Sequence, residues 1–332
     1  MKDTAAGERR YYSFNQFLKD TFGERVYKIS IDAGFTCPNR DGMRGVGGCF
    51  YCNNQGFSPN TRKPPASVHG QVEAGAEYLI RRYGARKFIA YFQAYTNTYA
   101  PVERLRQLYD EALLHPDVVG LSIGTRPDCV EEAVLDLLEG YTARHQVWLE
   151  LGLQSCQERT LRLINRGHTV AEFTDAVRRA QRRRDLLICA HIILGLPGES
   201  RSEMLASADF LSDLGINGVK IHLMHVLKDT PAEKTYQDGK LKVFTMDEYV
   251  NLVCDYIERL DPSVVIQRLT ADAPPDILVA PLWANRKKET IARIEKELVR
   301  RGACQGARRE KSTAETRNSL NGCAARIGTR SS

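Results

Sequence analysis

Three cysteines lie close together near the start of the chain, in the segment DAGFTCPNRDGMRGVGGCFYCNN. Cys37, Cys49 and Cys52 fall within sixteen residues and follow an apolar run. Glycine adopts left-handed backbone conformations at no steric cost, so the glycines of this segment allow tight turns that bring three thiolates together. Three thiolates suit a [4Fe–4S] cluster in which one iron stays open to a substrate or cofactor. The glycines are Gly34, Gly42, Gly45, Gly47 and Gly48.

Two other interpretations of these cysteines stay open at this point. A closed structural zinc site needs four ligands, and the nearest further candidate, His69, sits in a helical pattern. The other interpretation treats the three as unrelated buried residues. The remaining cysteines occur singly, and we expect them to be small apolar fillers or tail residues. They are Cys129, Cys156, Cys189, Cys254, Cys304 and Cys323.

Six short apolar runs, each followed by a helical pattern, predict strands that alternate with helices. They are rich in Val, Ile and Leu, which is typical of a parallel sheet covered on both faces. Most begin about 30 residues after the previous one, the length of one β-α unit. Six such units close most of a barrel or lie in an open doubly wound sheet. The predicted strands are Val26–Asp32, Phe88–Ala94, Val118–Gly124, Val147–Leu153, Leu186–Leu194 and Gly218–Met224.

Polar side chains collect at or near the carboxyl ends of these predicted strands. Functional groups gather at this edge in both β-α architectures. We therefore expect the residues there to line one site. They are Gln93, Thr125, Arg126, Glu150, Gln154, His191 and His222.

The pattern changes after Met224. A helix is predicted around Met246–Leu260, a strand at Val264–Leu269 and a last helix near Glu289–Arg301. The sequence thus divides into an N-terminal segment (1–24), a barrel (25–225) and an extension (226–302). We expect the extension to pack on the barrel and help to close its open side. Residues 303–332 are polar and basic, which predicts a disordered tail.

Charge and hydropathy favour a cytoplasmic protein. The net charge is +6, but residues 303–332 hold six basic and two acidic residues, which leaves +2 for the rest. A solvated tail is therefore favoured over an RNA-binding one. The run Leu186–Leu196 carries His191 and is too short to span a bilayer, so we expect no membrane contact. Residues 1–10 lack an apolar export signal, which is consistent with reduced thiols.

The cysteine motif resembles that of radical S-adenosylmethionine enzymes. The step from Cys37 to Cys49 is twelve residues, longer than the commonest form, and Cys49, Tyr51 and Cys52 form the usual Cys-x-aromatic-Cys. Within that superfamily the sequence resembles an uncharacterised bacterial family allied to the elongator catalytic subunit and oxygen-independent coproporphyrinogen oxidase, over about Tyr11 to Gly302. The motifs that carry this are DAGFTCPNRDG, GCFYCNN, YFQAYTNTYAP, IGTRPD, LGLQS, NRGHT, LGLPGE and KIHLMHVLKDT.

The resemblance implies an α/β fold, namely a partial (β/α)6 TIM-type barrel with a C-terminal α/β extension. It also implies that Cys37, Cys49 and Cys52 hold three irons of a [4Fe–4S] cluster. The fourth iron would chelate the amino and carboxylate groups of S-adenosylmethionine. The backbone at Tyr51 would then lie beside the adenine. Relatives contact the amino group through a Gly-Gly-Glu segment, whose place is taken here by Gln93–Thr98.

Further cofactor contacts follow from the same resemblance. Gln154 and Arg166 match a Gln and an Arg that hold the cofactor in the porphyrin-pathway relatives, and a guanidinium can bind a carboxylate through two hydrogen bonds. His191 stands where relatives have an Asp that contacts the ribose. The turn Leu194–Glu199 would support the cofactor through its backbone. The expected cofactor-binding residues are Tyr51, Gln93, Thr96, Glu150, Gln154, Arg166, His191, Leu223 and Met224.

Structural roles compete with these assignments. Gln154 and Arg166 are also compatible with capping and solvating a helix. His191 and His222 are equally compatible with satisfied core histidines. A basic helix end favours a solvated face over an RNA site. It comprises Arg178, Arg179, Arg182, Arg183 and Arg184.

The implied chemistry starts when a one-electron donor, such as flavodoxin or ferredoxin, reduces the cluster. Cleavage of S-adenosylmethionine then gives a 5′-deoxyadenosyl radical that abstracts hydrogen from a substrate. Alliance with the elongator subunit suggests modification of tRNA uridine at carbon 5, with tRNA as a partner, although the chain has no room for an acetyltransferase domain. The alternative is a small metabolite of the porphyrin-pathway type. A third hypothesis is a non-catalytic, zinc-stabilised nucleic-acid-binding protein.

Overall fold

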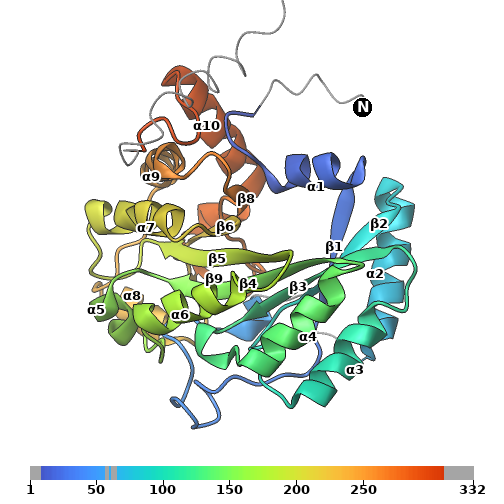
Figure 1. Ribbon diagram of the computed structural model, residues 1–332. Helices are drawn as coiled ribbons and strands as arrows, with labels where there is room; N and C mark the ends of the chain where they lie inside the picture. The colour runs from blue at the N-terminus through green and yellow to red at the C-terminus, as the bar shows by residue number, and fades with distance from the viewer. Residues whose placement is uncertain (1–8, 57–59, 61–65, 310–332) are drawn as a thin grey trace, which may run out of the picture.

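The computed structural model describes residues 9–56, 60 and 66–309. Seven parallel strands form one sheet in the order β1-β2-β3-β4-β5-β6-β8, and a separate antiparallel pair joins β7 to β9 (Figure 1). The strands are β1 (Val26–Ile31), β2 (Lys87–Phe92), β3 (Val118–Thr125), β4 (Gln146–Gln154), β5 (Leu186–Leu194), β6 (Gly218–Leu223), β7 (Val226–Leu227), β8 (Val265–Arg268) and β9 (Leu278–Ala280).

Helices follow the strands along the chain. Those between β1 and β6 lie against the outside of the curved sheet and bury apolar stripes on it. The α-helices are α1 (Phe14–Phe22), α2 (Val68–Tyr83), α3 (Val102–Ala112), α4 (Glu132–Thr142), α5 (Glu158–Leu163), α6 (Val170–Ala180), α7 (Arg201–Asp213), α8 (Pro231–Gln237), α9 (Met246–Arg259) and α10 (Lys287–Arg300). Short 3-10 turns are η1 (Asn54–Gly56), η3 (Pro127–Cys129) and η4 (Leu282–Asn285).

The predicted barrel is confirmed, and each of the six predicted strands matches β1 to β6 within two residues at either end. The sheet is a half-barrel because β1 and β8, at its two edges, pair with one neighbour each. Its strands are continuous apolar runs such as LLICAHIIL in β5, since both faces are covered.

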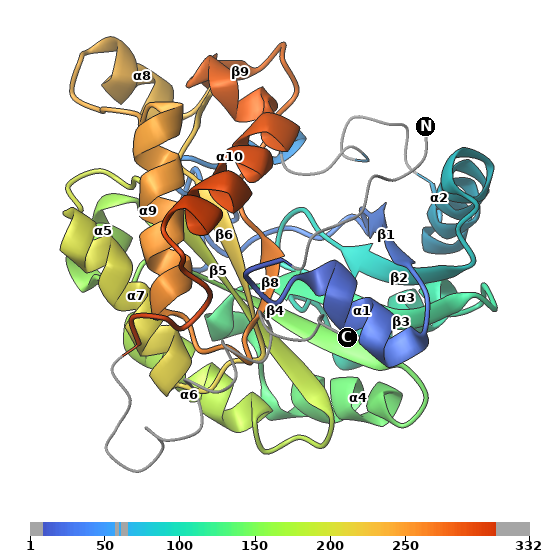
Figure 2. The same cartoon turned by 90° about the horizontal axis from the view of Figure 1, so that it is seen from above.

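The C-terminal extension contributes to the sheet itself. β8 pairs in parallel with β6, with Val265 opposite Gly218, so the half-barrel has seven strands where the sequence predicted six. Around it, α9 packs on α7 and α10 packs on α9 (Figure 2). The extension thus adds one strand to the edge of the sheet, and its helices pack on α7 and on each other.

The N-terminal segment closes the gap between the first and last strands. α1 contacts both β1 and β8, and the backbone N–H of Ile266 donates to Tyr12 O at 2.8 Å. Phe14 and Phe17 pack edge-on against Trp148, with ring centroids 5.8 and 5.4 Å away. Aromatic pairs of this geometry add about 0.5–1.5 kcal/mol each beyond the area that they bury.

Residues 303–309, which the sequence placed in the expected tail, contact the barrel. Gln305 is buried, and its amide donates to Asp261 O at 2.6 Å and to Val264 O at 2.8 Å. Its side-chain oxygen accepts from the backbone N–H of Tyr12 at 2.9 Å. Residues 303–309 thus dock on the end of α9 and the start of β8, which corrects the boundary at 303. Residues 310–332 lie outside the described part of the chain.

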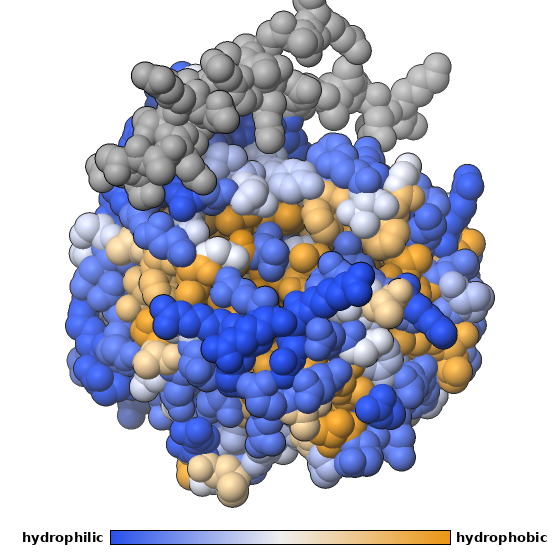
Figure 3. Space-filling view, viewed as in Figure 1, coloured by the Kyte–Doolittle hydropathy of each residue, from blue (hydrophilic) through white to orange (hydrophobic). Residues whose placement is uncertain are grey.

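No helix among the described residues is both long and apolar enough to cross a bilayer. Figure 3 shows that hydrophilic residues cover most of the face seen in Figure 1, with apolar residues in separate patches between them. Patches of this kind are ordinary on a surface that faces water.

Candidate active site

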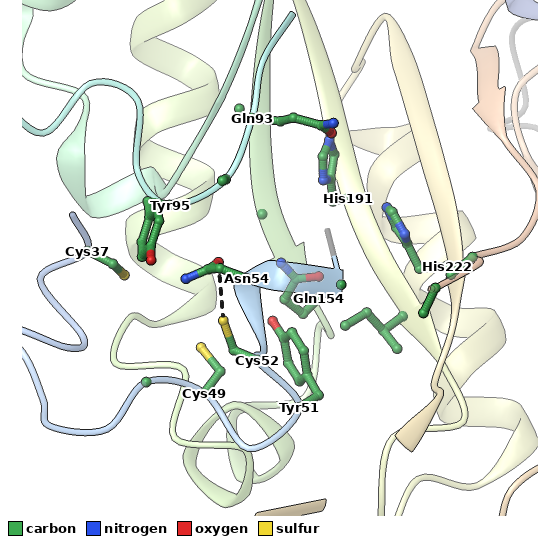
Figure 4. A pocket seen from close by; sticks show the side chains of 18 of the residues that line it. Cys37, Cys49, Tyr51, Cys52, Asn54, Gln93, Tyr95, Gln154, His191 and His222 are labelled. Carbon is green, nitrogen blue, oxygen red and sulfur yellow. Dashed lines mark hydrogen bonds between the residues drawn. The ribbon is translucent and has the colours of Figure 1, made fainter. Parts of the chain in front are cut away.

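A cavity of about 640 Å³ opens at the carboxyl ends of the parallel strands. This volume lies within the range of small-molecule sites in proteins. Its walls come from β1 to β6, β8, the cysteine loop between β1 and α2, the segment after β8 and the start of α10. Figure 4 shows part of this lining. The architecture puts the site where β-α barrels carry their chemistry.

The three clustered cysteines all line this cavity. The loop is held by tight turns, in which Arg40 N donates to Cys37 O at 2.8 Å and Cys52 N donates to Cys49 O at 2.9 Å. Gly48 has a φ of +85° and sits against the Arg40 side chain, where a Cβ would lie 2.9 Å from Nε. In Figure 4, Cys49 and Cys52 lie next to each other, Cys37 lies apart from them, and all three are on the side of the cavity away from His222.

Polar groups donate hydrogen bonds to two of the sulfurs. Asn39 Nδ2 and Arg166 Nη1 lie 3.5 and 3.6 Å from Cys49 Sγ, and Arg40 Nη2 lies 3.6 Å from Cys52 Sγ. Burial and the neighbouring Cys49 raise the pKa of Cys52 to about 11, and Arg40 opposes that rise. Cationic donors of this kind stabilise thiolates, and a bound metal would displace the remaining proton.

The donor set fits an iron–sulfur cluster better than a zinc ion. Among residues 9–56, 60 and 66–309, no three His, Cys, Asp or Glu side chains gather tightly enough to hold one metal ion. A closed zinc site requires four ligands around one centre. A cluster distributes its ligands over several irons, so three thiols spread around a cavity suit a cluster that keeps one open iron.

Arg166 and Gln154 converge on Gly152 beside the cysteines. Arg166 is 7% exposed and donates through Nη2 to Gly152 O at 3.0 Å, whereas its Nε is buried without a partner among the described residues. A Cβ on Gly152 would lie 2.5 Å from Arg166 Nη2 and 2.6 Å from Gln154 Nε2. This burial contradicts a solvated helix face for Arg166. The unpaired Nε fits a ligand carboxylate.

The backbone is strained at both places where the cofactor was expected. Gln154 has a φ of +72° at a register shift in β4, and Ala94 and Tyr95 have φ values of +74° and +62° directly after β2. Non-glycine residues in the left-handed region cost of order 1–3 kcal/mol and cluster at functional sites. The next residue, Thr96, lines the cavity with a buried Oγ1 that has no partner among the described residues.

Gln93, Tyr51, Leu223 and Met224 also line the cavity, as expected from the sequence. Gln93 donates to Ser30 Oγ at 2.9 Å. The turn Leu194–Glu199 does not line it, which corrects that expectation. The open side of Gly195 faces Phe244 instead, where a Cβ would lie 2.9 Å from the ring.

Glu150 does not line the cavity, so the structure contradicts its assignment to the cofactor. The side chain is fully buried beneath the cavity, where it forms salt bridges with Lys28 at 2.8 Å and with Lys220. Burial alone would raise the pKa of Glu150, but Lys220 and Lys28 hold it well below its usual range. Glu150 is therefore an ionised anchor, and His191 is the group it presents to the cavity.

His191 lines the cavity above this anchor. Its Nε2 lies 2.8 Å from Glu150 Oε2. Burial lowers the pKa of His191 to about 4, so the ring is neutral at pH 7. The carboxylate favours the tautomer that carries hydrogen on Nε2, which leaves Nδ1 as an acceptor. His222 lies beside it, with ring centroids 5.3 Å apart, and its Nε2 is buried without a partner in the described part of the chain.

Three arginines that line the cavity were not predicted as site residues, namely Arg40, Arg126 and Arg268. Arg126 was noted at a strand end, and it donates to Arg166 O at 2.8 Å while pairing with Asp128 at 2.8 Å. Arg268 ends β8. No sequence signal points to Arg268, because nothing local indicates that its strand joins the barrel.

Comparisons with known proteins agree with this geometry. The Radical SAM superfamily model matches residues 37–211, more than half of the chain, and the Radical_SAM C-terminal domain model matches 216–300. The uncharacterized protein YtqA of Bacillus subtilis is 42% identical over 299 residues, which cover 90% of this chain and 92% of that protein.

Relatives with a named activity are more distant. A tRNA uridine(34) acetyltransferase of Methanocaldococcus infernus is 29% identical over 172 residues, 48% of this chain and 30% of that protein. The solved structure of M. infernus Elp3 with an N-terminal deletion has the same fold, with a TM-score of 0.63 at 18% identity, over 84% of this chain and 64% of that one. The family implies a [4Fe–4S] cluster and S-adenosylmethionine. Its model and the 42% identical relative together establish that this chain is an enzyme of the radical S-adenosylmethionine superfamily.

Proposed function

We propose that this chain binds a [4Fe–4S] cluster through Cys37, Cys49 and Cys52 and cleaves S-adenosylmethionine reductively. When bound, the cluster supplies one electron to the sulfonium, and the resulting 5′-deoxyadenosyl radical removes hydrogen from a substrate. The observation that carries the proposal is that one cavity is lined by these cysteines and, beside them, by the buried Arg166, whose Nε has no partner in the part of the chain that the structure describes.

The side chains around the cavity have separate roles in this proposal. Arg166, with Gln154, binds the carboxylate of S-adenosylmethionine. Thr96 offers an unpaired hydroxyl to the amino group. The neutral Nδ1 of His191 accepts a hydrogen bond from the ribose. Leu223 and Met224, which are 1% and 2% exposed, provide the apolar wall for the adenine and help to exclude water from the reacting atoms.

Anaerobic reconstitution of the full chain tests this proposal. We expect about four irons and four sulfides per chain, and methionine with 5′-deoxyadenosine after reduction by dithionite. We expect neither the cluster nor the cleavage products after any one of the substitutions Cys37→Ser, Cys49→Ser and Cys52→Ser. The matched control is Cys189→Ser, because that buried thiol lies on β5 outside the cavity lining. Stoichiometric zinc with no iron under reducing conditions would favour the non-catalytic nucleic-acid-binding hypothesis instead. A one-electron donor such as flavodoxin or ferredoxin would replace dithionite in the cell.

Two substrate classes follow from different observations. Similarity to a tRNA uridine(34) acetyltransferase favours tRNA uridine modified at carbon 5, although the match covers 30% of that relative. The cavity volume and the near-neutral body of the chain favour a small metabolite. Nucleoside and metabolite profiles of cells with and without the gene separate the two. A tRNA substrate predicts a lost modified uridine, and a small substrate predicts an accumulated metabolite.

A further inference from the structure

Arg268 is the cation of the cavity wall that has no partner among the described residues. Four arginines and one lysine line the cavity. Arg40 donates to Cys52 O, Arg126 pairs with Asp128, Arg166 donates to Gly152 O and Lys287 pairs with Asp272. Arg268 makes no hydrogen bond or salt bridge within the described residues. A half-buried guanidinium without a partner favours a negatively charged ligand, because the charge is otherwise uncompensated.

The nearby carboxylates are already paired. Asp272 is the one acidic residue among the described residues that line the cavity, and it lies 3.5 Å from Lys287. Glu150 beneath the cavity is shared between Lys28 and Lys220. Neither carboxylate is free to neutralise Arg268, so this part of the barrel interior carries excess positive charge.

His222 adds a second group to the same wall. It lines the cavity, and its buried Nε2 has no partner among the described residues. Burial first, and then the positive charge of Arg268, lower the pKa of His222 well below its usual range, so the ring is neutral. A neutral imidazole can donate one N–H to an anion. Figure 4 shows His222 and His191 on the opposite side of the cavity from Cys37.

We propose that Arg268 and His222 bind an oxyanion group, a carboxylate or a phosphate, of a small substrate. The inference rests on the proposed radical function and names its substrate class. A small molecule is favoured over RNA because Arg268 is half-buried and lines the cavity at the end of β8, within range to shift the pKa of Lys220, which is 4% exposed. Backbone phosphates of RNA are bound mostly by basic residues on the protein surface.

Anion titration of the reconstituted, S-adenosylmethionine-loaded chain tests the site. Isothermal titrations with inorganic phosphate and with succinate should each show binding, and the tighter of the two identifies phosphate or carboxylate as the natural group. Arg268→Gln should weaken binding of that anion roughly tenfold to hundredfold, because a charge-assisted hydrogen bond is lost. His222→Phe should weaken it less. Arg293→Gln removes the same charge from an exposed position on α10, outside the cavity lining, and should leave binding unchanged.

Four results would contradict the proposal. Wild-type protein that binds neither anion has no such site, and binding that survives Arg268→Gln belongs elsewhere. If Arg268→Gln weakens the binding of S-adenosylmethionine as much as Arg166→Ala does, then Arg268 binds the cofactor and not the substrate. Iron content and cofactor cleavage are measured on the same samples, so a failure of the radical function is seen separately. In cells, complementation with Arg268→Gln should leave a carboxylated or phosphorylated metabolite elevated, and a change confined to tRNA nucleosides would contradict a small substrate.

Discussion

His191 Nε2 and Glu150 Oε2 lie 2.8 Å apart on neighbouring strands, with the carboxylate fully buried and the imidazole at the cavity wall. The buried carboxylate of Glu150 therefore holds the imidazole ring of His191 in one orientation. Lys28 and Lys220 keep the carboxylate ionised, and the carboxylate fixes the hydrogen of the imidazole on the side away from the cavity.

Removal of this anchor should destabilise the protein. Glu150→Gln leaves Lys28 and Lys220 without their counter-charge, and breaking a buried pair costs about 3–5 kcal/mol of unfolding free energy. Urea denaturation measures this loss, and nitrogen NMR of His191 should show mixed tautomers in any folded variant. The control is Glu295→Gln, whose partly exposed pairing with Arg9 is worth about 0–1 kcal/mol. Equal effects of the two substitutions would contradict the anchor role.

Stability should fall as the pH drops below about 6.5. The pKa of His191 is lowered to about 4 in the folded chain, so between these values the unfolded chain binds a proton that the folded chain does not. The free energy of unfolding therefore decreases toward low pH, by up to about 3 kcal/mol for this group. Anaerobic urea denaturation at about pH 7.5 and about pH 5 measures the slope. His191→Gln should make the unfolding free energy depend less steeply on pH. The dependence that remains should come from His168, whose pKa is lowered to about 3.

Arg166 should dominate the affinity for S-adenosylmethionine. Arg166→Ala removes a charge-assisted contact and should weaken binding roughly tenfold to hundredfold. Arg166→Lys should restore part of it, because an ammonium lacks the two-pronged geometry. Gln154→Ala should cost less, since a neutral hydrogen bond contributes about 0.5–1.5 kcal/mol. Isothermal titration of variants with equal iron content checks the order. Wild-type affinity in Arg166→Ala would refute the carboxylate role.

A single methyl group at Gly152 should produce a similar loss by steric means. The added Cβ would lie 2.5 Å from Arg166 Nη2 and 2.6 Å from Gln154 Nε2, so both side chains must move. We expect weaker binding of S-adenosylmethionine in Gly152→Ala with all three cysteines still in place. Gly140→Ala is the matched control, because its Cβ would meet nothing within 4 Å on α4.

Two truncations should behave differently. A chain that ends at Arg309 should keep the melting temperature of the full protein, since the sequence after it has no periodic apolar face. A chain that ends at Gly302 loses Gln305 and exposes the groups it satisfies, so we expect a lower melting temperature. Gln305→Ala isolates the effect, because each buried group left unpaired costs about 1–3 kcal/mol. Identical melting temperatures for the two truncations would show that the docked segment contributes nothing.

The sequence predicted elements whose signal is local. β1 to β6 are long apolar runs, and Cys37, Cys49 and Cys52 occur as one motif. β9 has three residues and was not predicted, and β8 was predicted as a strand without its place in the sheet. Strand pairing is non-local, so four residues such as VIQR carry no information on which neighbour they take.

The same limit explains the errors within the site. Glu150 and Gln154 are four residues apart, so alternation assigns them to the same face of a strand and does not show that Glu150 lies beneath the cavity while Gln154 lines it. Arg268 became a site residue only when β8 was placed beside β6. The docking of Gln305 depends on backbone groups of Asp261, Val264 and Tyr12, to which side-chain patterns are blind.

The link from Tyr12 to Gln305 also sets the order in which the molecule can be completed during synthesis. These residues are separated by 293 positions, and both hold the edge of the sheet at β8. Nearly all of the described chain must therefore have left the ribosome before β8 and the preceding Val264 can make their contacts with Tyr12 and Gln305. Contacts that close so long a loop form late, because the chain loses conformational entropy before these contacts stabilise it. The cysteine loop emerges early, whereas the wall that carries Arg268 is finished last, so cluster insertion can begin before the substrate side of the cavity exists.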